Sequence, residues 1–495
     1  MVKIALLVSY HPDETAPSLL SRLAAANRVQ SVTEFSRLVR LDHRKIGRGD
    51  EGELRRLFDL AGFDTERAPA SQPKMLPSSR REFDFGVLPS MRLAMSGVRF
   101  CPFCLKADIE SGADKPNLAP YRRLSWLLSS FRTCPEHGLP LTQVPALAVR
   151  EADFLGTVRP YLPKLCELAA IQVARACDFE AYLDRRMRTG TGGAILPDAL
   201  GMHGLMTASE AIGQVIEYGP TVRHKTLTEG AQARAANAGF NLLQQGEDAL
   251  DKFLMKLEPP REGARKASIH RAWGRFYTVV SQYRGDDLEP VKAVLRNAIL
   301  RRYPKKAGSV VLDKRVSSRR VHTMESAAKA TGIAPRTLRR LFQNEPSLVA
   351  LDTDINQAGS ITDENLAEAL EVVSRMMTGK AVIARLGTSR IQFERLVRLG
   401  IIGKMPGLDK YFDKSSVDRL MAALEGSAIP TTSAPVGTWS LVEAIASGLS
   451  TGRAIDFVIQ NRLDQIWCVE SEIGLRRIWL DETESKKKLH PTSPS

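Results

Sequence analysis

Apolar residues recur at helical spacing near the start of the chain. In the stretch DETAPSLLSRLAAAN, residues 13–27, the leucines fall on one face of a helix that has an acidic first turn. The next stretch, SVTEFSRLVRL, begins with Ser31 and Glu34 at the spacing of a capping box. DEGELRRLFDLAGF follows, whereas residues 66–82 are rich in Pro and Ser. The pattern predicts three short helices, in an arrangement similar to a helix-turn-helix, and then a loop.

The C-terminal third contains a degenerate internal repeat. Residues 325–343, 380–402 and 442–464 each combine a short apolar helix, a turn that contains Gly and a second amphipathic helix. Helix-turn-helix modules have this form because a small residue lets the two helices cross closely and the second helix can enter the major groove. The repeat predicts tandem helix-turn-helix modules, and ordinary helical hairpins remain the alternative.

Charge and length narrow the class of protein. The chain has 495 residues, of which 43% are apolar, so it can bury a substantial core. Basic residues exceed acidic ones by 70 − 56 = 14, which favours a polyanionic partner such as nucleic acid. No apolar window approaches the roughly 18 residues of a membrane span. The N-terminal MVKIALLVSY lacks a small-residue cleavage site, so we expect no signal peptide and a cytoplasmic, nucleoid-associated protein.

Three cysteines and a histidine have the spacing of a zinc site. RFCPFCLKAD contains Cys101 and Cys104, and RTCPEHGLPL contains Cys134 and His137. Each pair has two intervening residues, so two ligands can converge on one ion, and Gly138 can adopt the positive φ that often follows such a turn. Four soft ligands fill a tetrahedron and leave no open position for catalysis. The pattern predicts one structural Zn²⁺.

Other residues near these ligands have two interpretations. The segment between the pairs carries aromatic residues, which we expect to pack around the metal, and interleaved arginines, for which phosphate contact and a solvated face are equally good interpretations. Basic neighbours could offset the net charge of three thiolates. The remaining cysteines have no partner at ligand spacing and are interpreted as core residues. The aromatic residues are Tyr121, Trp126 and Phe131, and the interleaved arginines are Arg122, Arg123 and Arg132. The basic neighbours are Arg99, Lys106 and Arg132, and the remaining cysteines are Cys166, Cys177 and Cys468.

The chain resembles the TniQ family, which includes the TnsD-like proteins that select target sites for transposons. HPDETAPSLLSRLAAAN, residues 11–27, is similar to the opening motif of that family, and CPFCLKAD, YRRLSW and CPEHGLPL are similar to its zinc-binding part. The resemblance covers residues 1–145 and continues weakly through 237–258 and 273–283. Some members carry a second zinc site, but this sequence has no second paired cluster.

The resemblance implies a protein that selects target sites for transposition. It implies that the N-terminal core recruits an AAA+ ATPase, which in turn brings the transposase to double-stranded DNA. The sequence is also compatible with a homodimer. His11, Asp13 and Glu14 form a dense cluster of residue types used in catalysis, but the helix dipole explains acids at a helix start, so we predict no catalytic residue. An adaptor that bridges a separate DNA-recognition complex to the ATPase, and a stand-alone DNA-binding regulator, remain alternatives.

We therefore predict a mainly α fold with a helical N-terminal unit, an embedded zinc finger, a helical middle domain and tandem helix-turn-helix modules. The boundaries that we predict are 1–98 for the N-terminal helices of the TniQ domain, 99–145 for the zinc finger, 146–310 for the second helical part, 311–350, 351–430 and 431–482 for the three modules, and 483–495 for a disordered tail.

The basic content of the second helix predicts which modules contact DNA. The third copy sets Arg453 and Arg462 against Asp456 and Asp464, so it is expected to be structural or to hold a partner. The first two copies are more basic. The DNA-contacting residues that we predict are Arg336, Arg339 and Arg340 in the first copy, and Arg390, Gln392, Arg395 and Arg398 in the second.

Overall fold

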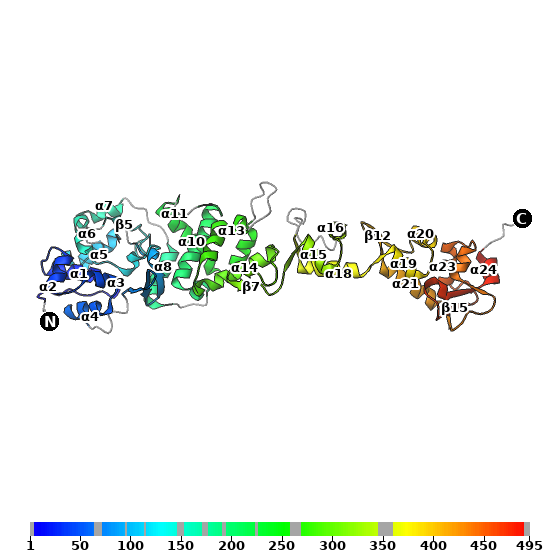
Figure 1. Ribbon diagram of the computed structural model, residues 1–495. Coiled ribbons are helices and arrows are strands. Elements are labelled where there is room, and N and C mark those ends of the chain that lie inside the picture. Colours follow the sequence, from blue (N-terminus) through cyan, green and yellow to red (C-terminus); the bar gives the residue numbers. More distant parts are fainter. Residues whose placement is uncertain are drawn as a thin grey trace. The chain divides into compact units, whose positions relative to one another are not determined.

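The protein is mainly α, as the sequence predicts, and its short strands form small sheets (Figure 1). A computed structural model describes residues 4–63, 72–94, 97–112, 115–145, 153–170, 177–190, 195–222, 226–257, 269–344 and 360–489. The chain divides into two compact units. Unit 1 comprises Met1–Ile299 and Val310–Lys314, and unit 2 comprises Leu300–Ser309 and Arg315–Ser495. Among the described residues, no helix combines the length and apolarity needed to cross a membrane.

The N-terminal helices of unit 1 share one hydrophobic core. The Ser31 side chain accepts a hydrogen bond from the Glu34 backbone N–H at 3.2 Å and begins the second helix, as its spacing indicated. Asp42 and Asp50 cap the next two helices in the same way. These helices are α1 (Ala16–Ala26), α2 (Val32–Leu38), α3 (His43–Arg48) and α4 (Glu51–Leu60).

A three-stranded antiparallel sheet occupies part of the segment for which a loop was predicted. Its strands are β1 (Lys74–Leu76), β2 (Arg80–Phe83) and β3 (Gly86–Pro89), in that order. Ser78 and Ser79 have φ values of 63° and 55°, which lets them turn the chain tightly between β1 and β2. The loop prediction was wrong here because residues typical of loops also build hairpin turns; the rest of that prediction, up to residue 71, lies outside the described residues.

Helices dominate the remainder of unit 1. The two longest, α10 and α11, approach closely at Gly213 and Gly239, where an added Cβ would lie 1.6 Å from the Ala235 carbonyl oxygen and 2.0 Å from the Ser209 carbonyl oxygen, respectively. The elements are β4 (Val98–Phe100), α5 (Pro102–Ser111), β5 (Thr142–Val144), α6 (Phe154–Val158), α7 (Leu165–Ala170), α8 (Asp178–Thr189), α9 (Leu196–Ala199), α10 (Met202–Tyr218), α11 (Glu229–Gln244), α12 (Glu247–Lys256), α13 (Ile269–Gln282), α14 (Glu289–Arg302), β6 (Val310–Val311) and β7 (Lys314–Arg315).

Unit 2 contains three pairs of short helices, which coincide with the three repeated stretches. Helix pair 1 is α15 (Met324–Thr331) and α16 (Pro335–Asn344), helix pair 2 is α19 (Gly379–Leu386) and α20 (Arg390–Arg398), and helix pair 3 is α22 (Leu441–Ala446) and α23 (Thr451–Ile459). A strand directly precedes each pair. These strands are β8 (Val321–Thr323), β10 (Met376–Thr378) and β14 (Thr438–Ser440).

The other elements of unit 2 connect and support the helix pairs. They are β9 (Ser360–Thr362), α18 (Asp363–Ser374), β11 (Lys404–Met405), β12 (Leu408–Asp413), α21 (Lys414–Gly426), β13 (Ile429–Thr431), β15 (Ile466–Val469), β16 (Ile478–Asp481) and α24 (Glu482–Leu489). β10, β12 and β11 form one sheet, and β13, β15, β16 and β14 form another. The sequence predicts a boundary at residue 430, but one hydrophobic core contains Leu396 of helix pair 2 together with Ala444 and Ile455 of helix pair 3. The finer domain boundaries stay predictions.

The segment predicted to be a disordered tail is helical as far as Leu489. The hydroxyl of Ser485 is buried and accepts a hydrogen bond from the Trp439 indole N–H at 2.8 Å. Lys486 pairs with Glu482 one helical turn earlier, so the lysines that suggested disorder contribute to a helix. Residues 490–495 lie outside the described residues.

Candidate functional site

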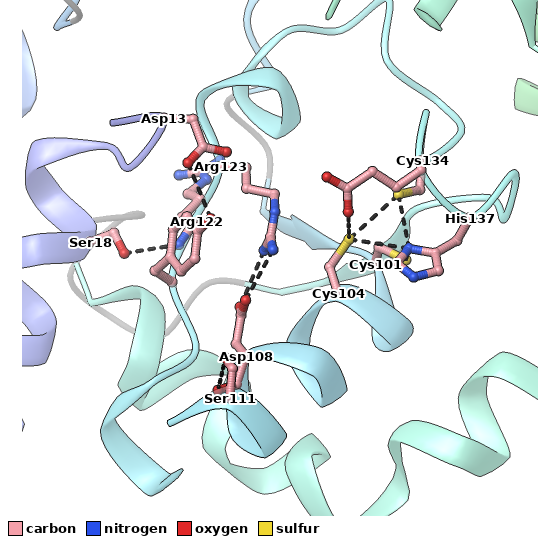
Figure 2. Close-up of polar contacts among 12 residues, drawn as sticks. Asp13, Ser18, Cys101, Cys104, Asp108, Ser111, Arg122, Arg123, Cys134 and His137 are labelled. Atoms are coloured by element: carbon pink, nitrogen blue, oxygen red, sulfur yellow. Dashed lines mark hydrogen bonds and ion pairs between the residues drawn. The ribbon is translucent and has the colours of Figure 1, made fainter. Parts of the chain in front are cut away.

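The four predicted metal ligands meet at one point in unit 1. One ligand atom from each of Cys101, Cys104, Cys134 and His137 lies within 4.8 Å of the others. The His137 Nδ1 atom is 3.6, 3.4 and 3.5 Å from the sulfurs of Cys101, Cys104 and Cys134, and the Cys104 and Cys134 sulfurs are 3.5 Å apart. Figure 2 shows the three sulfurs and the imidazole turned toward one another.

Two local structures hold these ligands. Cys101 is the N-cap of α5, and Cys104 lies in its first turn, so Pro102 fixes the start of a helix instead of an isolated turn. Cys134 and His137 lie in a turn that closes with a hydrogen bond from the Gly138 N–H to the Cys134 carbonyl at 2.8 Å. Gly138 has a φ of 64°, the positive value expected from the sequence. β4 and β5 pair as antiparallel strands beside the two ligand segments.

The donor set fits a closed tetrahedral metal site. Zn–S bonds of about 2.3 Å and Zn–N bonds of about 2.0 Å place neighbouring donors about 3.5 to 3.8 Å apart, close to the separations observed here. The three cysteines are buried, and hydrogen bonds from the Cys104 and Cys134 thiols hold the pKa of Cys101 well below its usual range. The cluster favours a thiolate at Cys101, and its four ligands converge on one point. It can therefore hold a metal ion and leave no coordination position open.

Arg123 provides a positive charge close to this cluster. Its guanidinium makes a bidentate ion pair with Asp108, at 3.0 and 3.2 Å, and lies 4.4 Å from the Tyr121 ring centroid and 4.9 Å from that of Trp126. Burial opposes its charge, but the hydrogen bonds to Asp108 and the charge of that carboxylate raise the pKa of Arg123. Figure 2 shows Arg123 between the metal cluster and Asp108. The sequence pattern did not reveal this role, although Asp108 follows Cys104 by one helical turn and Arg123 precedes a predicted core tryptophan.

The two interpretations offered for the neighbouring arginines were both wrong, because these side chains are largely buried in the protein. The residues expected to offset the thiolate charge also have other partners. Arg99 donates to the backbone carbonyls of Leu128 and Phe131, and Lys106 pairs with Glu110. The aromatic residues around the metal are core residues, as predicted: Tyr121, Trp126 and Phe131 are all buried.

Buried polar contacts connect this region to the helices that follow. Arg92 pairs with Glu210 of α10 at 2.6 Å, and the Ser130 hydroxyl donates to the other oxygen of the same carboxylate at 3.1 Å. The backbone N–H of Arg132 donates to Glu180 of α8 at 3.3 Å. Burial raises the pKa of Glu180 to about 7, and its Oε2 atom has no hydrogen-bond partner among the described residues.

The cluster around residue 14 has a structural role. Glu14 precedes the N-cap of α1 and is fully buried, where it pairs with Arg22 at 2.7 Å and accepts a hydrogen bond from Ser18 at 2.9 Å. The explanation from the helix dipole was therefore wrong, because the carboxylate is directed to Arg22. Burial raises the pKa of Glu14 to about 7.

The three cysteines outside the metal cluster differ in exposure. Cys468 is buried, as predicted for a core residue, and Cys177 is half-buried. Cys166 is exposed on α7, so its assignment to the core was wrong. The apolar side of that short helix is formed by Leu165 and Ala169 instead.

The predicted DNA-contacting residues of helix pair 1 lie on one face of α16. Arg336, Arg339 and Arg340 are exposed, whereas Leu338 and Leu341 are buried. The sequence of α16, PRTLRRLFQN, contains no acidic residue. Its surface is therefore strongly basic.

The residues of helix pair 2 have two different placements. Arg390, Arg395 and Arg398 are exposed on α20, and Arg390 pairs with Glu394 at 2.9 Å. Gln392 is buried: its side-chain oxygen accepts from the Ser389 N–H at 2.9 Å, and its amide donates to the Val442 carbonyl at 3.3 Å. Gln392 thus caps the start of the helix and ties it to helix pair 3, so the exposed residues among the four predicted contacts are the three arginines.

Comparison with known proteins identifies the N-terminal part of the chain. The TniQ family model matches residues 5–141, a segment that contains all four residues of the metal cluster. No curated protein matches the chain. The N-terminal part of the chain is therefore similar to the TniQ family over residues 5–141.

Proposed function

We propose that this protein binds duplex DNA and selects the target site for a transposition system. Helix pairs 1 and 2 act as helix-turn-helix modules, and α16 and α20 enter the major groove. The observation that carries the proposal is the exposed basic face of α16, which belongs to a chain that is similar to the TniQ family over residues 5–141 and has a net charge of +14. The protein acts without catalysis of its own, and its N-terminal domain recruits an AAA+ ATPase that brings the transposase.

The metal cluster supports this function structurally in our proposal. It binds one Zn²⁺, and the closed set of four ligands stabilises the N-terminal domain without exposing the ion to substrate. Zn²⁺ fits the Cys₃His donor set because soft thiolates and imidazole are its preferred ligands.

The proposal is tested by capture of genomic fragments with the purified full-length chain near physiological salt. We expect one enriched site, because arginines on the two recognition helices would read base edges. Even recovery of all fragments would contradict direct site selection and favour an adaptor whose specificity comes from a separate DNA-recognition complex.

A pair of matched variants locates the DNA contacts. Arg395→Gln with Arg398→Gln should lower affinity and reduce the slope of log K against log salt by about 0.9 for each phosphate that the protein no longer neutralises. Arg419→Gln with Arg453→Gln removes the same charge from exposed positions outside α16 and α20, and it should change affinity much less. Equal reductions of affinity in both variants would show that binding responds only to net charge.

A further inference from the structure

The hairpin that follows helix pair 2 is packed into helix pair 1. β11 and β12 are joined at Pro406 and Gly407, and the flanking Met405 and Leu408 are only 9% and 3% exposed. Both side chains belong to the hydrophobic cluster of helix pair 1, and β12 packs against α16. The members that helix pair 1 contributes to this cluster are Met324, Ala327, Ala328, Leu338, Leu341 and Phe342.

The hairpin that follows helix pair 3 makes the corresponding contact with helix pair 2. The connection between β15 and β16 passes against the C-terminal end of α19, where a Cβ added to Gly474 would lie 2.1 Å from the Leu386 carbonyl carbon. Arg476 donates to the Gly387 carbonyl at 3.2 Å, and Arg477 pairs with Glu425 of α21 at 2.6 Å. Only a glycine at 474 permits this close approach of the two backbones.

Because both hairpins are packed against a neighbouring helix pair, neither is free to extend toward DNA. The β11–β12 hairpin is held by apolar contacts to helix pair 1, and the β15–β16 hairpin by backbone contacts to helix pair 2. Strand β12 joins α16 to α20, because its Leu408 lies in the cluster of helix pair 1 and its Phe412 lies in the cluster that contains Leu396 of α20. Such a connection fixes the spacing of two helices, whereas a flexible linker lets each module find its own site.

We propose that the two hairpins are intermodule clamps, so that α16 and α20 bind one continuous stretch of duplex DNA at a single fixed spacing. The inference rests on the proposed DNA binding and adds the form of the site. Helix pair 3, whose second helix carries one arginine and one aspartate, supports α20 from the side and contributes little to the DNA surface.

The first test changes the DNA and leaves the protein intact. The probe is the duplex that the full-length chain selects from a randomised pool, with the two protected segments mapped by footprinting. Insertion of about 5 or about 10 base pairs between these segments changes their separation by half a turn or a full turn. We expect both insertions to weaken binding at least tenfold, since a rigid pair of helices cannot follow. Unchanged affinity with both insertions would overturn the clamp.

The second test separates a clamp from a DNA-contacting hairpin. Met405→Ser with Leu408→Ser removes the apolar contacts to helix pair 1, and Lys404→Gln with Lys410→Gln removes two exposed charges from the same hairpin. We expect the first variant to bind on the order of 100-fold more weakly and to tolerate the insertions, because the helices no longer act as one ligand. The second variant should bind less than about threefold more weakly.

The outcomes distinguish the inference from the proposed function. Much weaker binding by the lysine variant, with the apolar variant unchanged, would show that the hairpin touches DNA and would overturn the clamp alone. A footprint that protects one DNA segment instead of two would also overturn the clamp alone. Failure of the unaltered chain to select any sequence would overturn both. Near-ultraviolet circular dichroism checks that the apolar variant keeps folded helix pairs, and the single change Leu408→Ala repeats the test with a smaller loss of apolar contact if the double variant unfolds.

Discussion

At the scale of single residues, Arg123 connects the metal cluster to the helical core. Its guanidinium makes two hydrogen bonds to Asp108 while stacked near Tyr121 and Trp126, and only 12% of the side chain is exposed. Lysine keeps the charge but cannot reproduce the planar, bidentate contact. The contact between Arg123 and Asp108 therefore depends on the planar shape of the guanidinium as well as on its charge.

We expect Arg123→Lys to lower the free energy of unfolding of unit 1 by about 2 kcal/mol, because one oxygen of the buried Asp108 is left without its partner. Urea denaturation monitored by tryptophan fluorescence measures the change. Arg185→Lys is the matched control, since Arg185 also lies over a tyrosine but is exposed. An equal, small effect in both variants would contradict a special role for Arg123.

Glu180 predicts a pH dependence of stability in unit 1. Its pKa rises from about 4.5 unfolded to about 7 folded, so the folded state binds the proton more tightly. The stabilisation is complete below the unfolded pKa, is lost at about 1.4 kcal/mol per pH unit between the unfolded and folded pKa values, and has largely gone once the pH exceeds the folded pKa of about 7.

Glu180→Gln should therefore become more stable relative to the unaltered chain between pH 6 and pH 8, because the amide stays neutral. Urea midpoints at several pH values measure the difference, and the range lies above the pH at which protons displace metal from thiolates. Parallel curves for the two proteins would show that Glu180 does not titrate in this window.

At the scale of elements, Gln392 distinguishes the residues that stabilise α20 from the residues proposed to contact DNA on the same helix. Its side chain completes the capping box of α20 and binds the Val442 carbonyl. We expect Gln392→Ala to destabilise unit 2 by about 1 kcal/mol and to leave the salt dependence of DNA binding unchanged. Thermal unfolding and affinity at two salt concentrations check both parts; Arg398→Gln should show the opposite pattern.

The sequence was sufficient to predict elements whose signals are local. The metal ligands occur in two close pairs, and each helix pair contains its own periodicity and turn. Gln392 could not be assigned because a polar residue in the first turn of a helix can contact a ligand or cap the helix. The partnership of Arg123 with Asp108 joins two separate segments, so no local pattern reports it.

The missed elements are short or depend on tertiary partners. β11 has two residues, too few to show the alternation of a strand. α24 looks like a charged tail until Ser485 is placed against Trp439, and its lysines form a helix because glutamates lie one turn before them. The hairpin clamps become visible only when Met405 and Leu408 are assigned to the core of another module.

At the scale of the whole molecule, two units with separate cores should respond differently to removal of metal. Unit 1 contains the Cys₃His cluster, whereas the hydrophobic cores of unit 2 consist of apolar packing among its own helices and strands. A strong chelator should therefore lower the melting temperature of unit 1 and leave that of unit 2 unchanged in differential scanning calorimetry.

Cys134→Ser should reproduce the effect of the chelator without added reagent, since it removes one ligand of four. Cys166→Ser is the control, because Cys166 is exposed and lies outside the cluster. Elemental analysis should find metal in the control and less metal in Cys134→Ser. Equal metal content and identical melting profiles in the two variants would rule out the metal site.

The division of α20 into a buried and an outward face has a practical consequence for retargeting. Phe393 and Leu396 belong to the shared core, and Gln392 fixes the start of the helix. A combinatorial library aimed at a new DNA preference should therefore randomise only the outward positions and hold the inward ones constant, so that most members fold and selection acts on recognition. The positions to vary are Arg390, Ile391, Glu394, Arg395 and Arg398.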